Sequence, residues 1–249
     1  HGSAPMIQNQ IEQKSGKLLP LHMIQSCISN CECKIINITK KNGKSPLLRA
    51  TSVKPGERIH VDLIGKVGSG YLFVALDKAS NYLFGEVIKS RAVATQTAIS
   101  ALNFFRNHLA LNKLFICSIR ADNEFRTNQF IEYCTAKGIL LEFTAPASSP
   151  ENGAVERANR TLQNNIRLLL QSAHIPSQYW NFAARHFIFL QNHFTFNMNG
   201  LTPWETFRMS TSSIPKDFAL PPFGCKIAAY NENRGQKVFT ENFTGVFLG

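Results

Sequence analysis

The chain has 249 residues, and its 27 lysines and arginines against 16 aspartates and glutamates give a formal net charge of +11. Hydrophobic residues make up 44% of the sequence and charged residues 17%, a composition that excludes an intrinsically disordered protein. No apolar run reaches the roughly 18 residues of a membrane span, and no signal-peptide pattern opens the chain. We therefore expect neither a secreted nor a membrane-spanning protein.

Cysteines cluster near the start of the chain, at Cys27, Cys31 and Cys33. Thiolates at this spacing can bind one zinc ion if histidines elsewhere complete the ligand set, although ordinary surface cysteines are an equally open interpretation. Cys117 and Cys134 lie in apolar sequence, which indicates reduced core residues of an intracellular protein.

The excess positive charge is concentrated in residues 34–58. This segment holds seven basic residues and one acidic residue, a local charge of +6, whereas residues 59–210 hold 14 basic and 10 acidic residues, or +4. Basic residues spaced by Ser, Pro, Gly and Asn are typical of a linker that binds a polyanion, and also of a solvated loop. We interpret the segment as a basic linker in which Lys40, Lys41 and Lys44 contact a nucleic-acid backbone.

The next part of the chain predicts an α/β layer fold with a mixed sheet. Residues 57–67 alternate in polarity and are rich in β-forming residues, and residues 71–77 and 82–88, joined by a turn-like KASN, predict two further strands of an antiparallel meander. Residues 93–109 have helical apolar spacing, and a buried strand (114–122), a helix (128–138) that Gly138 ends, and a strand (139–145) follow. The order of these elements is typical of strands layered between helices.

A long helix is predicted after residue 149, with Ser149 as its N-cap and Pro150 at its first position. Its residues Glu156, Asn159, Arg160, Gln163 and Arg167 share one face, at offsets of 3, 4, 7 and 11. A second, aromatic helix is predicted over 178–196, and short β-like pieces from residue 211 onwards suit a small terminal subdomain.

Three acidic residues occupy positions that suit a shared metal site. Asp62 lies inside the first strand, Asp122 ends the fourth, and Glu156 is near the start of the long helix. Strand ends and helix starts meet at one edge of an open α/β sheet, and hard divalent cations prefer oxygen ligands. Taken singly, each acid is also compatible with an ordinary turn or surface role, and spacing alone does not separate Glu156 from Glu151 or Glu124.

The sequence motifs around these acids do separate Glu156 from the other two glutamates. The segments HVDLIG, IRADNEF, SSPENGAVERANRTL, LTPWETF, LPPFGCK and FTGVFLG occur in this order between about residue 57 and the last residue. Together they closely resemble the integrase of copia-type (Pseudoviridae) LTR retrotransposons. NGAVERANRTL is similar to the helix that carries the glutamate of the family's D-D-E triad, and PFGC and FLG to landmarks that follow its catalytic core.

The resemblance implies an RNase H-like fold and a DNA integrase, a polynucleotidyl transferase that joins retrotransposon DNA 3′ ends to target DNA, with 3′-end processing as a further step. Asp62, Asp122 and Glu156 match the triad that binds two Mg²⁺ ions, for which Mn²⁺ can substitute. By the same resemblance, Asn152, Asn159, Arg160, Gln163 and Arg167 match positions that contact DNA, together with the linker lysines. One departure is that 33 residues separate Asp122 from Glu156, two fewer than the family usually has.

The family also begins with an HHCC zinc module, which implies a partial module at residues 1–33. His1 with Cys31 and Cys33 is one ligand set, Cys27 with Cys31 is another cysteine pair, and His22 is an alternative to His1. We therefore divide the chain into this module (1–33), the basic linker (34–58), an integrase catalytic core (59–210) and the start of a β-rich C-terminal subdomain (211–249).

The resemblance further implies particular partners and a location. The partners are the retrotransposon LTR DNA ends, target DNA, further copies of the chain in a homo-multimer, and a host chromatin or transcription-machinery tethering factor, with no membrane involved. The location is the nucleus, after a cytoplasmic virus-like-particle stage. Two alternatives remain open: a domesticated or catalytically silent DNA- or chromatin-binding protein, and a metal-dependent nuclease of the same fold.

The linker interpretation predicts a salt-dependent effect. Neutralising Lys40, Lys41 and Lys44 together should weaken DNA binding and reduce the slope of log affinity against log salt, because fewer counterions are released. Fluorescence anisotropy with a labelled duplex at several salt concentrations measures both quantities. Unchanged binding at low salt would mean that the linker is only solvated.

Overall fold

The computed structural model describes residues 4–29, 54–144, 153–210, 214, 218, 220–229 and 243–249. A five-stranded mixed sheet lies at its centre, in the order β3-β2-β1-β4-β5. Strands β1 (Arg58–Val67), β2 (Gly70–Asp77) and β3 (Leu83–Ile88) form the predicted antiparallel meander, and β4 (Ser118–Ala121) and β5 (Leu140–Phe143) continue the sheet in parallel with β1. The predicted α/β fold with a mixed sheet is confirmed.

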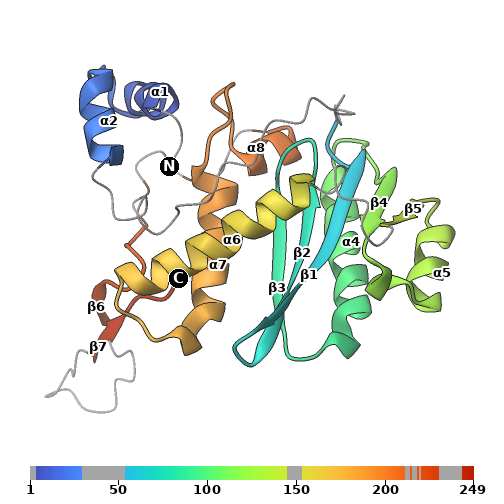
Figure 1. Ribbon diagram of the computed structural model, residues 1–249. Coiled ribbons are helices and arrows are strands. Elements are labelled where there is room, and N and C mark those ends of the chain that lie inside the picture. Colours follow the sequence, from blue (N-terminus) through green and yellow to red (C-terminus); the bar gives the residue numbers. More distant parts are fainter. Residues whose placement is uncertain are drawn as a thin grey trace, which may run out of the picture.

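Helices cover both faces of this sheet (Figure 1). Helix α4 (Ala94–Ala110) packs behind the sheet, and α5 (Asn128–Ala136) lies beside β5. Helices α6 (Gly153–Ser172) and α7 (Trp180–Phe194) cover the other face, and α8 (Pro203–Arg208) contacts both α7 and α4. Single 3₁₀ turns precede α4, α5 and α7: η1 (Arg91–Val93), η2 (Asn123–Phe125) and η3 (Ser177–Tyr179).

Strand alternation divides the core into two apolar layers. Along β1, Ile59, Val61 and Leu63 point to the layer under α4, and Ile64 points to the layer under α6 and α7. The first layer buries Phe73, Phe105, Phe125, Phe130 and Phe207. The second contains Leu72, Val74, Leu162, Ile166 and Ala184. Because His60 and Asp62 alternate with the first set, they lie on the α6 side of the sheet.

The buried carboxylate of Asp77 holds in place the segment that leads into β1. It accepts hydrogen bonds from the backbone N–H of Gly56 (2.7 Å), the backbone N–H of Ser80 (2.8 Å) and the Ser80 hydroxyl (2.6 Å). Gly56 has φ = 84°, and a Cβ there would lie 2.8 Å from the carbonyl oxygen of Phe115, so only glycine fits. These contacts hold residues 54–57 beside the turn between β2 and β3.

The two ends of the chain form smaller units. Helices α1 (Ala4–Ser15) and α2 (Leu21–Ser29) pack side by side, apart from the sheet (Figure 1). Strands β6 (Lys226–Ala229) and β7 (Phe243–Val246) form a two-stranded antiparallel sheet. Phe223 and Phe247 flank this pair and contact the ring of His186 on α7. No helix in the described ranges is both long and apolar enough to cross a membrane.

One cysteine prediction is wrong. Cys134 is buried as expected, but Cys117 is exposed. The predicted strand over 114–122 is shorter than its apolar sequence indicated, since β4 begins only at Ser118. In the segment before it, Ile116 is buried whereas Phe115 is 73% exposed, so apolar composition alone does not identify the buried side chains.

Helix α7 is held to the edge of the sheet by one buried amide. Asn192 accepts a hydrogen bond from the backbone N–H of Leu83 (2.9 Å) and donates one to the Leu83 carbonyl oxygen (2.8 Å). Its side chain thus supplies the two bonds that a further strand would give to the edge strand β3.

Replacing Asn192 by leucine should lower the free energy of unfolding by roughly 2–5 kcal/mol, because two buried backbone groups lose their partners at about 1–3 kcal/mol each. Urea denaturation measures the change. Asn107→Leu, at an exposed position of α4, is the matched control and should change stability by no more than about 0.5 kcal/mol. Equal urea midpoints for the two variants would contradict this role of Asn192.

Candidate metal centre

Parallel pairing of β1 with β4 brings two aspartates together. Val61 pairs with Ala121, so Asp62, in the middle of β1, and Asp122, the residue after the end of β4, are neighbours. Asp122 then serves as the N-cap residue of η2, which carries Glu124. One carboxylate oxygen from each of Asp62, Asp122 and Glu124 lies within 4.8 Å of the others.

Hydrogen bonds fix the orientation of both aspartates. Asp62 accepts one from the backbone N–H of Leu63 (2.8 Å) and one from the side-chain amide of Asn159 on α6. Asp122 accepts one from the hydroxyl of Thr144 (2.6 Å), and the Thr144 backbone N–H donates to the Ala121 carbonyl oxygen (3.0 Å). The carboxylates are therefore positioned by α6 on one side and by the end of β5 on the other.

The carboxylates at this centre repel one another. Burial is the main reason why the pKa of Asp62 lies above its ordinary value, and the nearby carboxylate of Asp122 raises it further. Desolvation also raises the pKa of Glu124, with additional increases from Asp62 and Asp122, while the Arg91 guanidinium opposes the shift. The centre thus concentrates negative charge that only partial hydrogen bonding offsets.

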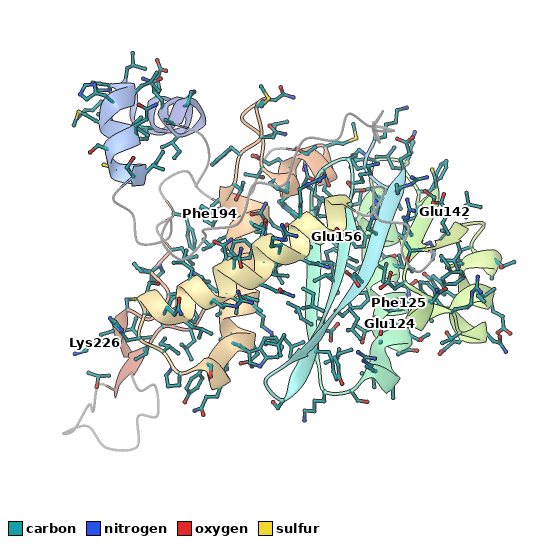
Figure 2. All side chains as sticks on the ribbon, viewed as in Figure 1. Glu124, Phe125, Glu142, Glu156, Phe194 and Lys226 are labelled. Atoms are coloured by element: carbon teal, nitrogen blue, oxygen red, sulfur yellow. The ribbon has the colours of Figure 1, made fainter. Side chains whose placement is uncertain are left out.

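Glu156 is at a different place from Glu124. It is an exposed residue in the first turn of α6, whereas Glu124 comes from η2 after β4, and β1 lies between these two elements (Figures 1 and 2). Glu156 is not in the group of carboxylates within 4.8 Å. Its charge still contributes to the raised pKa of Asp62, so the two carboxylates interact. The structure thus places Glu124 beside Asp62 and Asp122, and Glu156 near enough to Asp62 to affect its pKa.

The donor set fits a hard divalent cation. Carboxylate oxygens are the ligands that Mg²⁺ and Mn²⁺ prefer, and a cation would relieve the repulsion that raises the pKa of Asp62. The buried side-chain oxygen of Asn159 has no hydrogen-bond partner, although its amide nitrogen is bonded to Asp62. A further polar oxygen is therefore present next to the carboxylates. Among the residues that the structure describes, this is the one recorded cluster of potential metal ligands.

The predicted DNA-contact residues divide into two groups. On α6, Arg160 and Arg167 are exposed and Gln163 is half-buried, while Asn159 is directed to Asp62. Asn152 and the linker lysines Lys40, Lys41 and Lys44 lie outside the described residues. Their roles stay predictions.

The predicted zinc ligands His1, Cys31 and Cys33 also lie outside the described residues. The alternatives His22 and Cys27 are exposed on α2, and the described part of the chain contains no metal-ligand cluster around them. The zinc module stays a prediction as well.

His60 has the structural role that its position in the strand predicts. It is 3% exposed, two residues before Asp62 in β1. Burial, with smaller contributions from the cations Lys78, Arg120 and Arg58, lowers the pKa of His60 to about 4. The imidazole is neutral at physiological pH and gives no positive charge to the carboxylates.

Two residues that position the centre have no clear sequence signal. Asn159 stands three residues after Glu156, so both lie on one face of α6, but helical spacing does not show that this face meets β1. Thr144 follows β5 and reaches Asp122 because β4 and β5 are paired in parallel.

The chain is similar in part to one class of curated protein. No protein-family model matches it. It is 29% identical, over 130 residues, to the retrovirus-related Pol polyprotein from transposon TNT 1-94 of Nicotiana tabacum; the match covers 50% of this chain and 9% of that polyprotein. The chain thus corresponds to a small part of its curated relative.

Solved structures of viral integration proteins have a similar fold. A chain of the simian T-cell lymphotropic virus intasome, solved in complex with the PP2A regulatory subunit B56 gamma, has a TM-score of 0.54 at 17% identity, over 98% of this chain and 87% of that chain. The BIV integrase catalytic core domain has a TM-score of 0.46 at 19% identity, over 61% of this chain and 93% of that domain. The HTLV-2 integrase catalytic core domain in complex with magnesium has a TM-score of 0.47 at 20% identity, over 62% of this chain and 97% of that domain.

These findings support the resemblance to copia-type retrotransposon integrases that the sequence motifs predicted. The mixed sheet with flanking helices is the fold that this chain shares with the intasome chain. The predicted zinc module and C-terminal subdomain gain no support from the comparison.

Asp62→Asn should stabilise the metal-free protein. A raised pKa means that the folded state holds the Asp62 proton to a higher pH than the unfolded chain, so stability is lost as pH rises through this window and the charge opposes folding at pH 7. In EDTA at pH 7 the variant should therefore melt at a higher temperature than the wild type, by about 2–4 °C for each kcal/mol gained. This advantage should vanish below the ordinary aspartate pKa of about 4.

Magnesium should reverse the order of the melting temperatures. Mg²⁺ binding stabilises the folded wild type by mass action, and the variant lacks one charged ligand. Scanning fluorimetry with and without Mg²⁺ tests both effects, with Glu132→Gln, an exposed acid of α5, as the control for loss of one negative charge. A destabilised Asp62→Asn variant in EDTA, or one with the full magnesium effect, would contradict the account.

Proposed function

We propose that this chain is a retrotransposon integrase that catalyses metal-dependent strand transfer, in which the 3′-hydroxyl of a linear DNA end attacks a phosphodiester of target DNA. The observation that carries the proposal is the convergence of Asp62, Asp122 and Glu124 where β1 pairs with the end of β4, with Asn159 of α6 bonded to Asp62. The sequence likeness to a retrotransposon Pol polyprotein and the shared fold support it.

In the proposed mechanism, Asp62 and Asp122 would hold one divalent cation, and Asp62 and Glu156 would hold a second. Two such cations supply activation of the attacking hydroxyl and stabilisation of the charge on the leaving oxygen. Asn159 donates to one oxygen of Asp62 and Leu63 to the other, so Asp62 keeps its orientation while it serves both positions. No histidine is needed as a general base, which agrees with the buried, neutral His60.

We assign Glu156 as the third metal-binding carboxylate, beside Asp62 and Asp122, and we assign Glu124 an auxiliary role. Asn159, on the same face of α6 as Glu156, already bonds to Asp62, so this face is directed towards the aspartates. The carboxylate of Glu124 interacts with the Arg91 guanidinium, which partly neutralises it. Glu124 would then set the charge beside Asp122 without being required for the reaction.

The remaining positive charge would hold DNA by its phosphates. Arg160 and Arg167 are exposed on α6, seven residues apart, so both can face a DNA backbone beyond the carboxylates. Gln163, Asn152 and the linker lysines would extend this contact. Because these groups bind the backbone, they would give affinity without sequence preference.

The same proposal includes the wider biology that the resemblance implies. Joining two DNA ends to one target requires more than one active site, so the active form would be a homo-multimer on LTR ends and target DNA. The reaction would take place in the nucleus, where a chromatin or transcription-machinery factor would tether the complex.

A strand-transfer assay tests the proposal. The substrates are a short labelled duplex that ends in the element's terminal sequence, and a supercoiled plasmid, with Mg²⁺ or Mn²⁺. We expect joined product from the wild type, a loss of at least about 100-fold in Glu156→Gln, since one metal ligand loses its charge, and less than about tenfold in Glu124→Gln.

The two glutamine variants are matched controls for each other, because each removes one carboxylate near Asp62. Full activity of Glu156→Gln would contradict the assigned triad, and an inactive Glu124→Gln with an active Glu156→Gln would exchange their roles. A wild type that binds DNA but forms no product, while its metal-dependent stabilisation is intact, would favour the catalytically silent DNA-binding alternative.

A further inference from the structure

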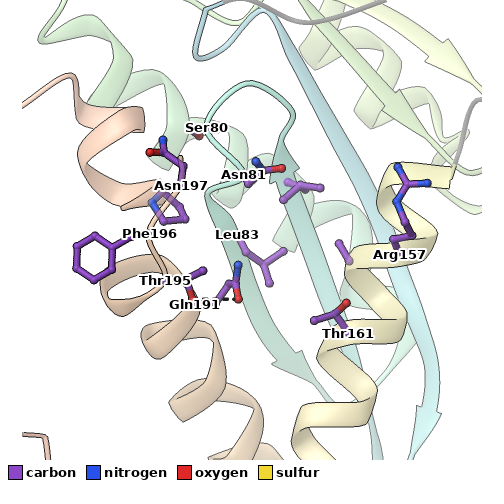
Figure 3. A pocket seen from close by; sticks show the side chains of 12 residues that line it. Ser80, Asn81, Leu83, Arg157, Thr161, Gln191, Thr195, Phe196 and Asn197 are labelled. Carbon is purple, nitrogen blue, oxygen red and sulfur yellow. Dashed lines mark hydrogen bonds between the residues drawn. The ribbon is translucent and has the colours of Figure 1, made fainter. Parts of the chain in front are cut away.

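A pocket of about 350 Å³ lies between α6, α7 and the turn that joins β2 to β3 (Figure 3). It is lined by residues of α6, of the turn between β2 and β3, of the last turns of α7, and of the segment between α7 and α8. Its volume is in the range of small-ligand pockets, roughly 300–1,000 Å³. Nothing in the proposed mechanism uses it.

The polar lining of this pocket is rich in donors and contains no acidic residue. Arg157 stands on α6 at one end of the pocket, and Thr161, four residues on, shares its face (Figure 3). Among the described residues, no ion pair of Arg157 is recorded. Gln191 on α7 accepts a hydrogen bond from Thr195 (3.4 Å) through Oε1, which leaves its amide nitrogen to donate. This combination favours an anion with additional acceptor groups.

Apolar side chains form the other part of the lining. Leu76 and Leu83 are buried side chains of β2 and β3, and Pro203 is the first residue of α8. A ligand that satisfies the whole pocket therefore has a charged group for Arg157 and a flat or apolar group beside Leu76 and Leu83. A nucleotide has both, as a phosphate and a base.

Helix α6 connects this pocket with the carboxylate centre. Asn159 donates a hydrogen bond to Asp62, while Arg157 and Thr161, about half a turn away around the helix, line the pocket. The two sites are thus separated by about one helix diameter, roughly 10–12 Å. A DNA strand covers this distance in at most about three nucleotides, because an unpaired strand extends further for each nucleotide than the rise of about 3.4 Å along a duplex.

We propose that this pocket binds one unpaired nucleotide of a DNA strand whose neighbouring phosphates lie at the carboxylate centre. The inference rests on the proposed function, since it assigns the same DNA to both sides of α6. Bases in a duplex are stacked and paired and cannot enter a pocket, so the site selects an unpaired tail or an extruded base. Arg157 binds its phosphate, and the base packs against Leu76 and Leu83.

Fluorescence anisotropy on the full chain tests this inference independently of catalysis, because EDTA prevents metal-dependent chemistry. The two probes are a labelled duplex with an unpaired tail of three thymidines and the same duplex with a blunt end. The wild type should bind the tailed probe about tenfold more tightly. Arg157→Gln should lower the ratio of the two affinities to near one. Arg185→Gln, which removes an exposed arginine of α7 outside the pocket, should leave this ratio unchanged.

Thr161→Phe provides a second variant that fills the pocket without changing the charge, and it should also remove the preference for the tail. Equal binding of the two probes by the wild type, or a ratio that neither Arg157→Gln nor Thr161→Phe lowers, would overturn the inference. Competition with octaglutamate tests for an acidic protein partner instead. If octaglutamate competes equally with the tailed and the blunt probe, and binds the wild type but not Arg157→Gln, the inference is overturned and the pocket is assigned to an acidic protein partner.

The result is distinguishable from a failure of the proposed function. A wild type that joins DNA but shows no preference for the tail would reject the nucleotide pocket alone. A wild type that forms no joined product, but whose tail preference depends on Arg157 and Thr161, would retain the pocket and reject strand transfer.

Discussion

The parallel pairing of β1 with β4 is the constraint on which the candidate site depends. Because Val61 pairs with Ala121, the next residues in both segments, Asp62 and Asp122, are placed next to each other where β4 ends. Four residue pairs of β1 and β4 define this register. A shift by one residue would turn the side chains of β1 to the opposite faces, and both the apolar layer under α4 and the aspartate pair would be lost. Core packing and site geometry thus select the same register.

The carboxylate cluster destabilises the fold when no metal is bound. Half-buried Asp62 has a raised pKa because burial and Asp122 both disfavour its charge. Hydrogen bonds from Asn159 and Thr144 hold the two aspartates in place despite their repulsion. Such a centre is strained without a cation and relaxed with one, so metal binding and folding are expected to be thermodynamically linked. This linkage is a physical reason to interpret the cluster as functional, since a structural role would be served better by neutral side chains.

The sequence predicted the elements and two of the acidic positions well, for definite reasons. Alternation along residues 57–67 identifies a strand, and an aspartate that ends a buried strand marks the edge where ligands bind in α/β folds. The proximity of Glu124 to Asp62 and Asp122 was not predicted, because it depends on a single 3₁₀ turn after β4. The Asn159 contact with Asp62 depends on how α6 crosses β1, and the exposure of Cys117 depends on where β4 begins. Both are properties of tertiary packing that local spacing does not contain.

Direct observation of a bound cation tests the central claim most sharply. Crystals of the chain grown with Mn²⁺ give an anomalous scattering signal at each manganese position. The account predicts a manganese peak ligated by carboxylate oxygens of both Asp62 and Asp122, in the wild type and not in Asp62→Asn. A wild-type crystal at saturating Mn²⁺ with no anomalous peak between these aspartates, or with the peak retained in Asp62→Asn, would contradict it.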